Sequence, residues 1–485
     1  MNYDLCVMAK AKKQITAEEF EESLIRNFAF EPTHGQKRLF YAFTRMMFSE
    51  KPRCALIIKG YAGTGKTTTV SAMVKTLESS GKRVVLLAPT GRAAKVLSNY
   101  SGMPASTIHK QIYYRKSDRS GHSWFELKEN ELENTVFFVD EASMIGTERF
   151  SLVQGDIGSG DLLEDLISHV YSGEGCRLVL IGDGAQLPPV GSDQSPALKL
   201  DYLRNEFSLH IAEIELNEVI RQKEGSGILE NATRLRDYIA AQSKDYPQLI
   251  YEGFKDVTKV ESDLQPIMEE AISRYGRDGA IIITRSNKRA NMYNQNMRQR
   301  ILFYEDEIST GDRMMILKNN YFWLDDESAS KAGFIANGDI VIIERVRSFE
   351  ERGEFRFCKV VVRLLDYPDL PEMEVLLLLN TLWEESAGLA YEKIRELGNL
   401  IAKDYEHLEN IGKIKKAVQE DPYYNALHVK FAYAITCHKS QGGQWPCVLV
   451  DQGYVTEEMY GVELNRWIYT AFTRAQKELF LVGFS

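Results

Sequence analysis

Residues 54–67 read CALIIKGYAGTGKT, a short apolar run that passes directly into glycines, a lysine and a threonine. The spacing Gly60-x-x-x-x-Gly65-Lys66-Thr67 is that of the phosphate-binding P-loop, which joins a buried strand to the start of a helix. Glycines allow successive backbone N–H groups to surround a phosphate, because no Cβ blocks its approach. The positive N-terminal end of the following helix attracts the same anion. We therefore predict that this protein binds and hydrolyses a nucleoside triphosphate.

The polar side chains of this region have distinct expected roles. Lys66 reaches the β- and γ-phosphates, and the hydroxyl of Thr67 ligates Mg²⁺. Residues 135–141 form an apolar run that ends in Asp140 and Glu141, which is typical of the acidic pair that accompanies a P-loop. Asp140 is expected to hold Mg²⁺, and Glu141 to orient or deprotonate the attacking water. ATP and Mg²⁺ are the expected cofactors, and the loop residues expected to contact the nucleotide are Gly60, Tyr61, Ala62, Gly63, Thr64, Gly65, Lys66, Thr67 and Thr68.

The composition is that of an ordinary soluble globular protein. A chain of 485 residues is too long for a single core, so we expect two to four domains. The net charge of −10 argues weakly against a nucleic-acid-binding protein, because only the local field at a binding groove matters. The cysteines are scattered and include no CxxC pair, which favours reduced core residues in a cytosolic protein. No run approaches the ~18 apolar residues of a membrane span, and no signal peptide is evident.

Polar clusters follow two further apolar runs. Residues 83–88 lead into a proline, a threonine and an arginine, and residues 105–110 form a second cluster of the same kind. Ligands bind at the carboxyl edge of an open α/β sheet, where such clusters lie. Each cluster alone is equally consistent with a solvated helix start. As candidates for a binding surface we select Pro89, Thr90, Arg92, Thr107, His109 and Lys110.

Two glutamines are candidates for recognising the nucleotide. Gln36 lies just upstream of the P-loop strand, and its amide can pair with both the donor and the acceptor of the adenine edge. Taken alone, it is more typical of a surface residue. Gln186 follows the apolar run 177–182 on a loop stiffened by Pro188 and Pro189. This position suits a side chain that senses the γ-phosphate and moves the loop in response.

Two segments interrupt the alternation of strands and helices. Residues 111–134 read as two short β runs around a polar turn, which predicts a small hairpin insertion. Residues 311–381 contain four closely spaced β runs, which favour a small barrel, and Asn337-Gly338 is a strong turn signal within them. Residues 384–420 follow with apolar residues at helical spacing, which predicts core-packing helices.

Five motifs occur in a characteristic order: GYAGTGKT at 60–67, APTGRAA at 88–94, STIH at 106–109, DEAS at 140–143 and GDGAQLPPV at 182–190. This order resembles that of superfamily 1B DNA helicases, and most closely the RecD-like and Dda-like branch. The yeast-type PIF branch ranks second, because it usually carries Pro-Phe-Gly-Gly before the last motif. This chain has YSGEGC there instead, at 171–176.

The resemblance implies an α/β fold with two RecA-like P-loop NTPase cores in tandem and ATP in the cleft between them. The first core is expected at residues 1–205, with the β-hairpin insertion at 111–134. The second core is expected at 206–310 and 429–485. An SH3-like β-barrel with a helical insertion is expected between these two parts, at 311–428.

The resemblance also implies roles for residues that the local pattern does not define. Arg221, between the two cores, and Arg474, in the last motif, are implied as arginine fingers that join Lys66, Asp140, Glu141 and Gln186 in catalysis. Contacts near the γ-phosphate are implied for Gln441 and Gly442. DNA contacts are implied for the two polar clusters and for Pro189, Val190, Thr436, His438, Lys439 and Ser440.

The implied function is ATP-dependent translocation on single-stranded DNA in the 5′→3′ direction, coupled to duplex unwinding in repair, recombination or replication. Single-stranded DNA and duplex junctions are the expected partners, together with repair or replication proteins, and a cytosolic monomer without membrane contact is expected. Two alternatives remain open: an ATPase subunit of a RecD-like recombination nuclease complex, and an ATP-gated binding switch that does not unwind. The intact Glu141 and Arg474 argue against a silent motor.

The hairpin at 111–134 is a candidate for the element that separates the strands. Tyr113, Tyr114, Trp124 and Phe125 lie on its two β runs and could stack on exposed bases. In the alternative interpretation these aromatic side chains pack inward against the first core.

Overall fold

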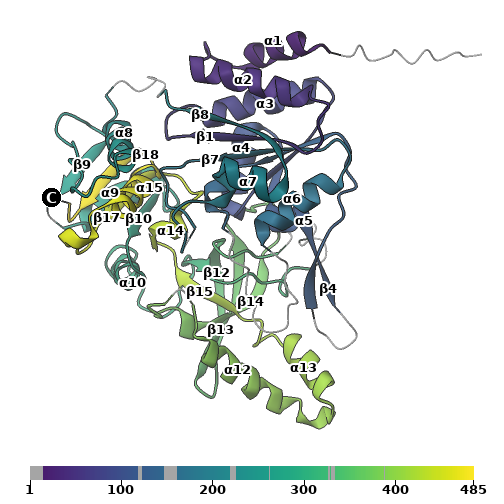
Figure 1. Cartoon of the computed structure of the whole chain (residues 1–485). Coiled ribbons are helices and arrows are strands. Elements are labelled where there is room, and N and C mark those ends of the chain that lie inside the picture. Colours follow the sequence, from purple (N-terminus) through teal and green to yellow (C-terminus); the bar gives the residue numbers. More distant parts are fainter. Residues whose placement is uncertain are drawn as a thin grey trace, which may run out of the picture.

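The structure is a computed structural model that describes residues 15–117, 123–146, 161–189, 191–218, 225–261, 263–325, 328, 334–386 and 388–484. These residues form two parallel sheets, a closed barrel and a hairpin, which confirms the expected fold class. Figure 1 shows the first sheet at the top, the second at the left and the barrel below. None of the described helices has both the length and the apolarity to cross a membrane.

The first core is a six-stranded parallel sheet in the order β3-β2-β6-β7-β1-β8. Successive side chains of a strand point to opposite faces, so Leu56 of β1 enters one apolar cluster and Ile57 the other. The strands are β1 (Cys54–Gly60), β2 (Arg83–Ala88), β3 (Ala105–Thr107), β6 (Thr135–Val139), β7 (Arg177–Gly182) and β8 (His210–Leu216). One face is covered by α1 (Ala17–Asn27), α2 (His34–Met47), α3 (Lys66–Ser79) and α4 (Gly91–Ser101). The other face is covered by α5 (Ile108–Ile112), α6 (Leu162–Ser172) and α7 (Leu200–Phe207).

Strand β8 lies at the edge of the first sheet. It pairs in parallel with β1 over its whole length, from His210 opposite Cys54 to Leu216 opposite Gly60. The sequence analysis places residues 206–310 in the second core. In the structure, β8 still belongs to the sheet of the first core, which therefore extends past residue 205. The alternation of apolar and charged residues in β8 is typical of an edge strand, which the continuous apolar runs of buried strands do not resemble.

The second core is a five-stranded parallel sheet in the order β16-β10-β17-β18-β9. Its strands are β9 (Val257–Val260), β10 (Ala280–Thr284), β16 (Ala434–Thr436), β17 (Trp445–Asp451) and β18 (Ala475–Val482). Its helices are α8 (Gly227–Ala240), α9 (Gln265–Tyr275), α10 (Asn287–Asn296), α14 (Cys437–Ser440) and α15 (Val462–Phe472), with a π-helical turn at Met297–Ile301. Short 3₁₀ turns in the chain are Ala142–Met144, Pro196–Leu198, Leu379–Thr381, Glu406–Leu408 and Glu457–Met459.

The barrel lies between the two parts of the second core along the chain. Its strands are β11 (Arg313–Ile316), β12 (Ile340–Arg352), β13 (Phe355–Leu364), β14 (Met373–Leu378) and β15 (Leu427–Phe431). Four of them match the expected β runs. The fifth, β15, closes the barrel by pairing with β11 and β14. It includes Val429, where the sequence places the return of the second core. Helices α12 (Tyr391–Asp404) and α13 (Ile411–Gln419) pack against the barrel.

A buried ion pair anchors the barrel to the second core. Arg298 donates from Nε and Nη2 to the two carboxylate oxygens of Asp312, at 2.8 and 2.9 Å. Tyr433 and the N–H of Ser309 donate to the same carboxylate, at 3.1 and 2.7 Å. Asp312 immediately precedes β11, so this network fixes where the barrel begins.

The hairpin insertion consists of β4 (Tyr113–Ser117) paired antiparallel with β5 (Ser123–Leu127), as the sequence predicts. It projects away from the first core in Figure 1. Tyr113 packs inward and donates to Oδ2 of Asp165 in α6 at 2.6 Å, whereas Tyr114 is exposed. Trp124 and Phe125 have side chains outside the described part. Of the aromatic residues proposed to stack on bases, Tyr113 therefore serves the core.

We expect Asp312→Asn to lower the free energy of unfolding by about 3–5 kcal/mol, because it leaves the guanidinium of Arg298 buried without a counter-charge. Urea denaturation followed by tryptophan fluorescence measures the change. Glu230→Gln is the matched control, since Glu230 pairs with Arg234 at 3.2 Å on the surface and its loss should cost about 0–1 kcal/mol. Equal effects of the two substitutions would contradict an anchoring role for the buried pair.

Candidate nucleotide and nucleic-acid site

The P-loop connects the carboxyl end of β1 to the first turn of α3. Gly63 and Gly65 have φ values of 78° and 81°, in the left-handed region that favours glycine. A Cβ on Gly60 would lie 2.8 Å from Cγ of Lys66 and would displace the lysine side chain. Backbone conformation therefore favours glycine at Gly63 and Gly65, and side-chain packing favours it at Gly60. Thr67 and Thr68 lie in the first turn of α3, with Thr67 exposed.

Lys66 folds back across the loop. Its ammonium donates to the carbonyl oxygens of Gly60 and Tyr61, the latter at 3.0 Å. It also lies 3.8 Å from Oδ2 of Asp183, a buried carboxylate that follows β7. The ammonium is thus held at the mouth of the loop by a fixed negative charge, where an entering phosphate would compete for it.

Asp140 and Glu141 follow the buried strand β6. Glu141 has a φ of 51°, a conformation that is strained for a residue other than glycine and that clusters at functional sites. Its N–H donates to Oδ1 of Asp140 at 2.9 Å, and the Tyr100 hydroxyl donates to Oδ2 at 2.6 Å. Neighbouring groups therefore orient both oxygens of Asp140. The sequence carries no signal for Tyr100, because only tertiary packing brings α4 to the end of β6.

An arginine of the second core acts on the acidic pair. Burial raises the pKa of Glu141, and the positive charge of Arg474 opposes that rise. Arg474 is almost fully buried and donates from Nε to the carbonyl of Thr470 at 3.1 Å and from Nη1 to that of Gly443 at 3.3 Å. The guanidinium is thus held by its own core while it acts electrostatically on the other. Arg221 lies outside the described residues.

Helix α15 makes hydrogen bonds to the first core. The Tyr469 hydroxyl accepts from the P-loop N–H of Ala62 at 2.9 Å and donates to Oδ2 of Asp183 at 2.7 Å. The Thr470 hydroxyl accepts from the N–H of Leu187 at 2.8 Å. These contacts join the second core to the P-loop and to the loop after β7. No role is expected for either residue from the sequence, although both precede Arg474 in its motif.

The loop after α14 reaches the first core beside these contacts. Gln441 donates from Nε2 to the carbonyl of Leu187 at 2.7 Å. Gly442 packs on α4 so closely that a Cβ there would lie 2.9 Å from the Cβ of Ala93. Gln186, next to Leu187, is buried, and its Oε1 has no hydrogen-bond partner within the described part of the chain.

Gln36 is buried against the P-loop. Its Oε1 accepts from the N–H of Thr33 at 3.0 Å, which completes the capping box of α2, and its Nε2 donates to the carbonyl of Thr64 at 3.3 Å. The amide is therefore bound to protein on both sides. Its expected contact with adenine stays a prediction, and it requires one of these bonds to be exchanged.

A groove of about 610 Å³ lies where the two cores and the barrel meet. Its first-core and second-core lining includes six of the candidate nucleic-acid residues, namely Pro89, Thr90, Thr107, His109, His438 and Lys439. The barrel contributes residues that the sequence did not indicate, among them Lys318, Asn319, Tyr321, Phe334, Asn337 and His428. The barrel is therefore part of this surface.

The other candidate nucleic-acid residues that the structure describes do not line this groove. The guanidinium of Arg92 stacks on Trp445 at 4.1 Å from the ring centroid, within the contact between the cores. The Ser440 hydroxyl is buried and donates to the carbonyl of Cys437 at 2.7 Å. Val190 is outside the described residues. The candidates absent from the lining are Arg92, Lys110, Pro189, Thr436 and Ser440.

The charge of the groove is low. Burial lowers the pKa of His109 and of His428 to about 4, so both imidazoles are neutral at neutral pH. Burial, together with the charge of Lys430, lowers the pKa of Lys439 to about 8. The Lys439 ammonium donates to Oδ1 of Asn337 at 2.5 Å. A bound strand therefore meets more neutral hydrogen-bonding groups than cations here.

These elements define a P-loop NTPase with two RecA-like cores, an α/β architecture in which the second core reaches into the nucleotide site of the first.

Comparisons with known proteins agree with this class. A family model for an AAA domain matches residues 34–246, and one for a UvrD-like helicase C-terminal domain matches residues 431–482. The ATP-dependent DNA helicase dda of Enterobacteria phage T4 is 24% identical, over 93% of this chain and 99% of its own. The ATP-dependent RecD2 DNA helicase of Deinococcus radiodurans is 33% identical over 36% of this chain, which spans 21% of that relative.

Among solved structures, a Pif1 helicase from Bacteroides in complex with ADP-AlF3 and single-stranded DNA has a TM-score of 0.46 and 16% identity, covering 93% of this chain and 92% of its own. The chain is related to the superfamily 1 DNA helicases RecD2 and Dda, as its motifs indicate.

We expect Tyr469→Phe to lower the free energy of unfolding by about 1–3 kcal/mol, because the buried Asp183 loses a hydrogen-bond donor while the ring still fills its space. Urea denaturation in the absence of nucleotide measures this change. Tyr454→Phe is the control, since Tyr454 is 83% exposed. A loss in Tyr469→Phe no greater than in the control would show that the bridge contributes nothing to stability.

Proposed function

We propose that this chain is an ATP-dependent DNA helicase that moves 5′→3′ along single-stranded DNA and couples ATP hydrolysis to duplex unwinding. The observation that carries the proposal is that one second-core segment, residues 436–443, reaches both surfaces. Gln441 of this segment is hydrogen-bonded to Leu187 beside the nucleotide site, while His438 and Lys439 of the same segment line the groove. A change at the nucleotide site is therefore transmitted to the groove.

In this proposal the residues of the first core bind and activate the substrate. The backbone N–H groups and Lys66 hold the phosphates of ATP, and Glu141 orients the attacking water and accepts its proton. Mg²⁺ fits the donor set, since the carboxylate of Asp140 and the hydroxyl of Thr67 are the hard oxygen ligands that this ion prefers. When bound, it would neutralise charge on the phosphates.

The second core contributes residues to the nucleotide site from the side opposite the P-loop. Arg474, and by family resemblance Arg221, neutralise charge that develops on the γ-phosphoryl group, a role worth ~10³–10⁵ in turnover in related NTPases. We propose that Gln186 and Gln441 sense whether the γ-phosphate is present. Gln186 precedes Leu187 in the chain, and Gln441 is hydrogen-bonded to the carbonyl of Leu187, so the two glutamines lie on adjoining segments of the two cores. Hydrolysis would therefore loosen the contact between the cores.

Single-stranded DNA is proposed to lie in the groove between the cores and the barrel. Hydroxyls such as that of Thr107 and neutral imidazoles such as that of His109 would hold its backbone, with Lys439 as a cation. Opening and closing of the cores would then shift the strand stepwise. His438 and Lys439 would move with the second core, whereas Thr107 and His109 would stay with the first.

A strand-displacement assay tests the activity and its direction together. We expect the parent protein to unwind a duplex with a 5′ single-stranded tail in the presence of ATP and Mg²⁺, and to leave a 3′-tailed duplex intact. Unwinding of the 3′-tailed substrate alone would reverse the proposed direction. ATPase activity without unwinding of either substrate would favour the ATP-gated binding switch.

Glu141→Gln is the decisive variant in the same assay. We expect it to keep ATP and DNA binding but to lose about 10²–10⁴-fold in ATP turnover and all unwinding, because only proton acceptance is removed. Glu131→Gln, at an exposed position, is the matched control and should behave as the parent. ATPase activity in Glu141→Gln near that of the parent would sink the assignment of this residue.

The affinity for single-stranded DNA should fall as pH rises from 7 to 9. The pKa of Lys439 lies at about 8, so its positive charge is present below this pH and lost above it. Fluorescence anisotropy with a labelled oligothymidylate measures the profile. Lys439→Arg should flatten it, because arginine stays charged throughout. A parent profile as flat as that of Lys439→Arg would show that Lys439 does not contact the strand.

A further inference from the structure

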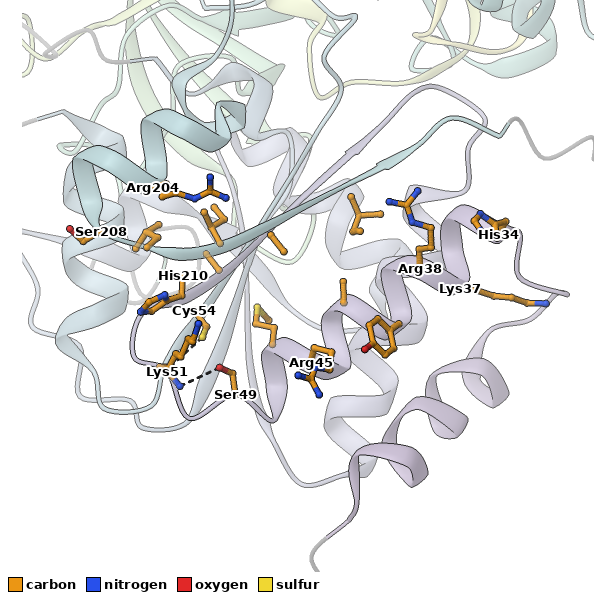
Figure 2. A pocket seen from close by; sticks show the side chains of 18 residues that line it. His34, Lys37, Arg38, Arg45, Ser49, Lys51, Cys54, Arg204, Ser208 and His210 are labelled. Carbon is orange, nitrogen blue, oxygen red and sulfur yellow. Dashed lines mark hydrogen bonds between the residues drawn. The ribbon is translucent and has the colours of Figure 1, made fainter.

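A second groove lies on the outer side of the first core, away from the nucleotide and DNA surfaces described above. It has a volume of about 1200 Å³ and runs between α2 and the edge strand β8, with Arg204 of α7 on its far side (Figure 2). This volume exceeds the ~300–1,000 Å³ of usual small-molecule pockets. The shape therefore suits an extended ligand.

The charge of this groove is opposite to that of the whole protein. Its 18 lining residues include no aspartate or glutamate, although the chain carries a net charge of −10. Five of them are basic: Lys37, Arg38, Arg45, Lys51 and Arg204. All five are exposed. Lys37 pairs with Glu31 at 2.8 Å and Arg204 with Asp201 at 3.6 Å, whereas the other three make no ion pair within the described residues.

The basic residues of α2 form a single stripe. His34, Lys37, Arg38, Tyr41 and Arg45 recur at spacings of three and four, so they share the helix face beside the groove. Figure 2 shows Arg38 and Arg45 on this side, with the α2 helix running alongside β8. Holding the unpaired cations Arg38 and Arg45 on one face costs repulsion, which an acidic ligand would relieve.

The floor of the groove offers main-chain groups and apolar contact. The main-chain N–H of His210 donates to the carbonyl of Arg53. In a parallel pair, alternate residues of a strand face the partner strand, so the N–H and C=O groups of Ile211 and Glu213 point away from β1. Among the described strands, β8 pairs with β1 alone. Ala212 and Ile214 add apolar surface. The acidic Glu213 is itself paired with Lys59 at 2.8 Å, which removes it as a source of repulsion.

We propose that this α2–β8 groove binds an extended acidic segment of a partner protein, which adds as a strand to the edge of β8. Main-chain hydrogen bonds to Ile211 and Glu213 would provide affinity, and carboxylates would pair with Arg38 and Arg45. A nucleic acid could satisfy the cations but leaves the strand-edge donors and acceptors unused. An acidic peptide in extended conformation satisfies both sets of groups.

Fluorescence anisotropy on the full chain, with fluorescein-labelled (Glu-Val)5 as the probe, tests this proposal. We expect saturable binding, and a loss of at least about tenfold in affinity for Arg38→Glu/Arg45→Glu, equivalent to about 1.4 kcal/mol. Arg395→Glu/Lys415→Glu is the matched control, since it makes the same charge change at exposed positions on α12 and α13. The control should bind the probe as the parent does. Arg38→Gln/Arg45→Gln replaces the reversal variant if circular dichroism shows that the latter is unfolded.

A second peptide separates strand addition from simple charge attraction. A (Glu-Val)5 peptide in which every main-chain nitrogen is methylated keeps the charges but has no N–H group that could pair with β8, so we expect it to bind at least about tenfold more weakly than (Glu-Val)5. Equal binding of the two peptides would overturn the proposal, as would absence of (Glu-Val)5 binding or equal losses in the two double variants. Competition by (dT)10 that depends on Arg38 and Arg45 would instead assign the groove to nucleic acid. Self-association abolished by Arg38→Glu/Arg45→Glu, without peptide binding, would assign it to a second copy of the chain.

Discussion

The hydroxyl of Tyr469 makes the hydrogen bonds on which the position of one core relative to the other depends. It accepts the N–H of Ala62 in the P-loop and donates to Asp183, so one buried group of the second core touches both phosphate-site loops of the first. A buried carboxylate is costly unless its oxygens are satisfied. Asp183 is satisfied by Tyr469, by the N–H of Ala185 at 3.0 Å and by the ammonium of Lys66. The register of α15 against the first core is thereby fixed.

Once α15 is fixed, the remaining second-core groups follow from its geometry. Arg474 lies five residues after Tyr469 and is held by the carbonyl of Thr470, so the same end of α15 places both the Tyr469 contact and the charge that acts on Glu141. Helix α14 packs on α15 through the thiol of Cys437, which donates to the carbonyl of Trp467 at 3.5 Å. His438 and Lys439 of α14 line the central groove, so this groove is joined through α15 to the P-loop.

The parts of the site that the sequence predicts are those whose geometry is local. The P-loop is defined by a glycine spacing that the backbone needs, and the Asp140–Glu141 pair by a strand that ends where its polar residues begin. Tyr100 and Tyr469 were not predicted, because their partners are distant in sequence. Asp140 lies 40 residues from Tyr100, and Ala62 lies 407 residues from Tyr469. Only packing of complete elements brings such pairs together.

The contrast between local and long-range geometry also explains where the predicted fold and the predicted groove differ from the structure. Strands β8 and β15 each join a sheet or barrel other than the one their neighbours in sequence suggest. Their partners, β1 for β8 and β11 and β14 for β15, are formed much earlier in the chain. Arg92 matches a DNA-contacting motif, yet Trp445 from the second core provides a flat surface on which its guanidinium stacks. The barrel lining of the groove carries no motif, because its polar residues come from two segments far apart in sequence, the β11–β12 connection and the segment that leads into β15.

The distribution of charge separates two kinds of recognition on one acidic protein. In the central groove, buried imidazoles are neutral and Lys439 has a lowered pKa, so hydrogen-bonding groups outnumber charges. A strand bound here, as proposed, would be held by hydrogen bonds more than by ion pairs. The α2–β8 groove instead exposes unpaired cations that a fixed acidic ligand can neutralise. If the two proposals hold, the surface that releases its strand at every step carries few charges, and the surface that retains a partner carries several.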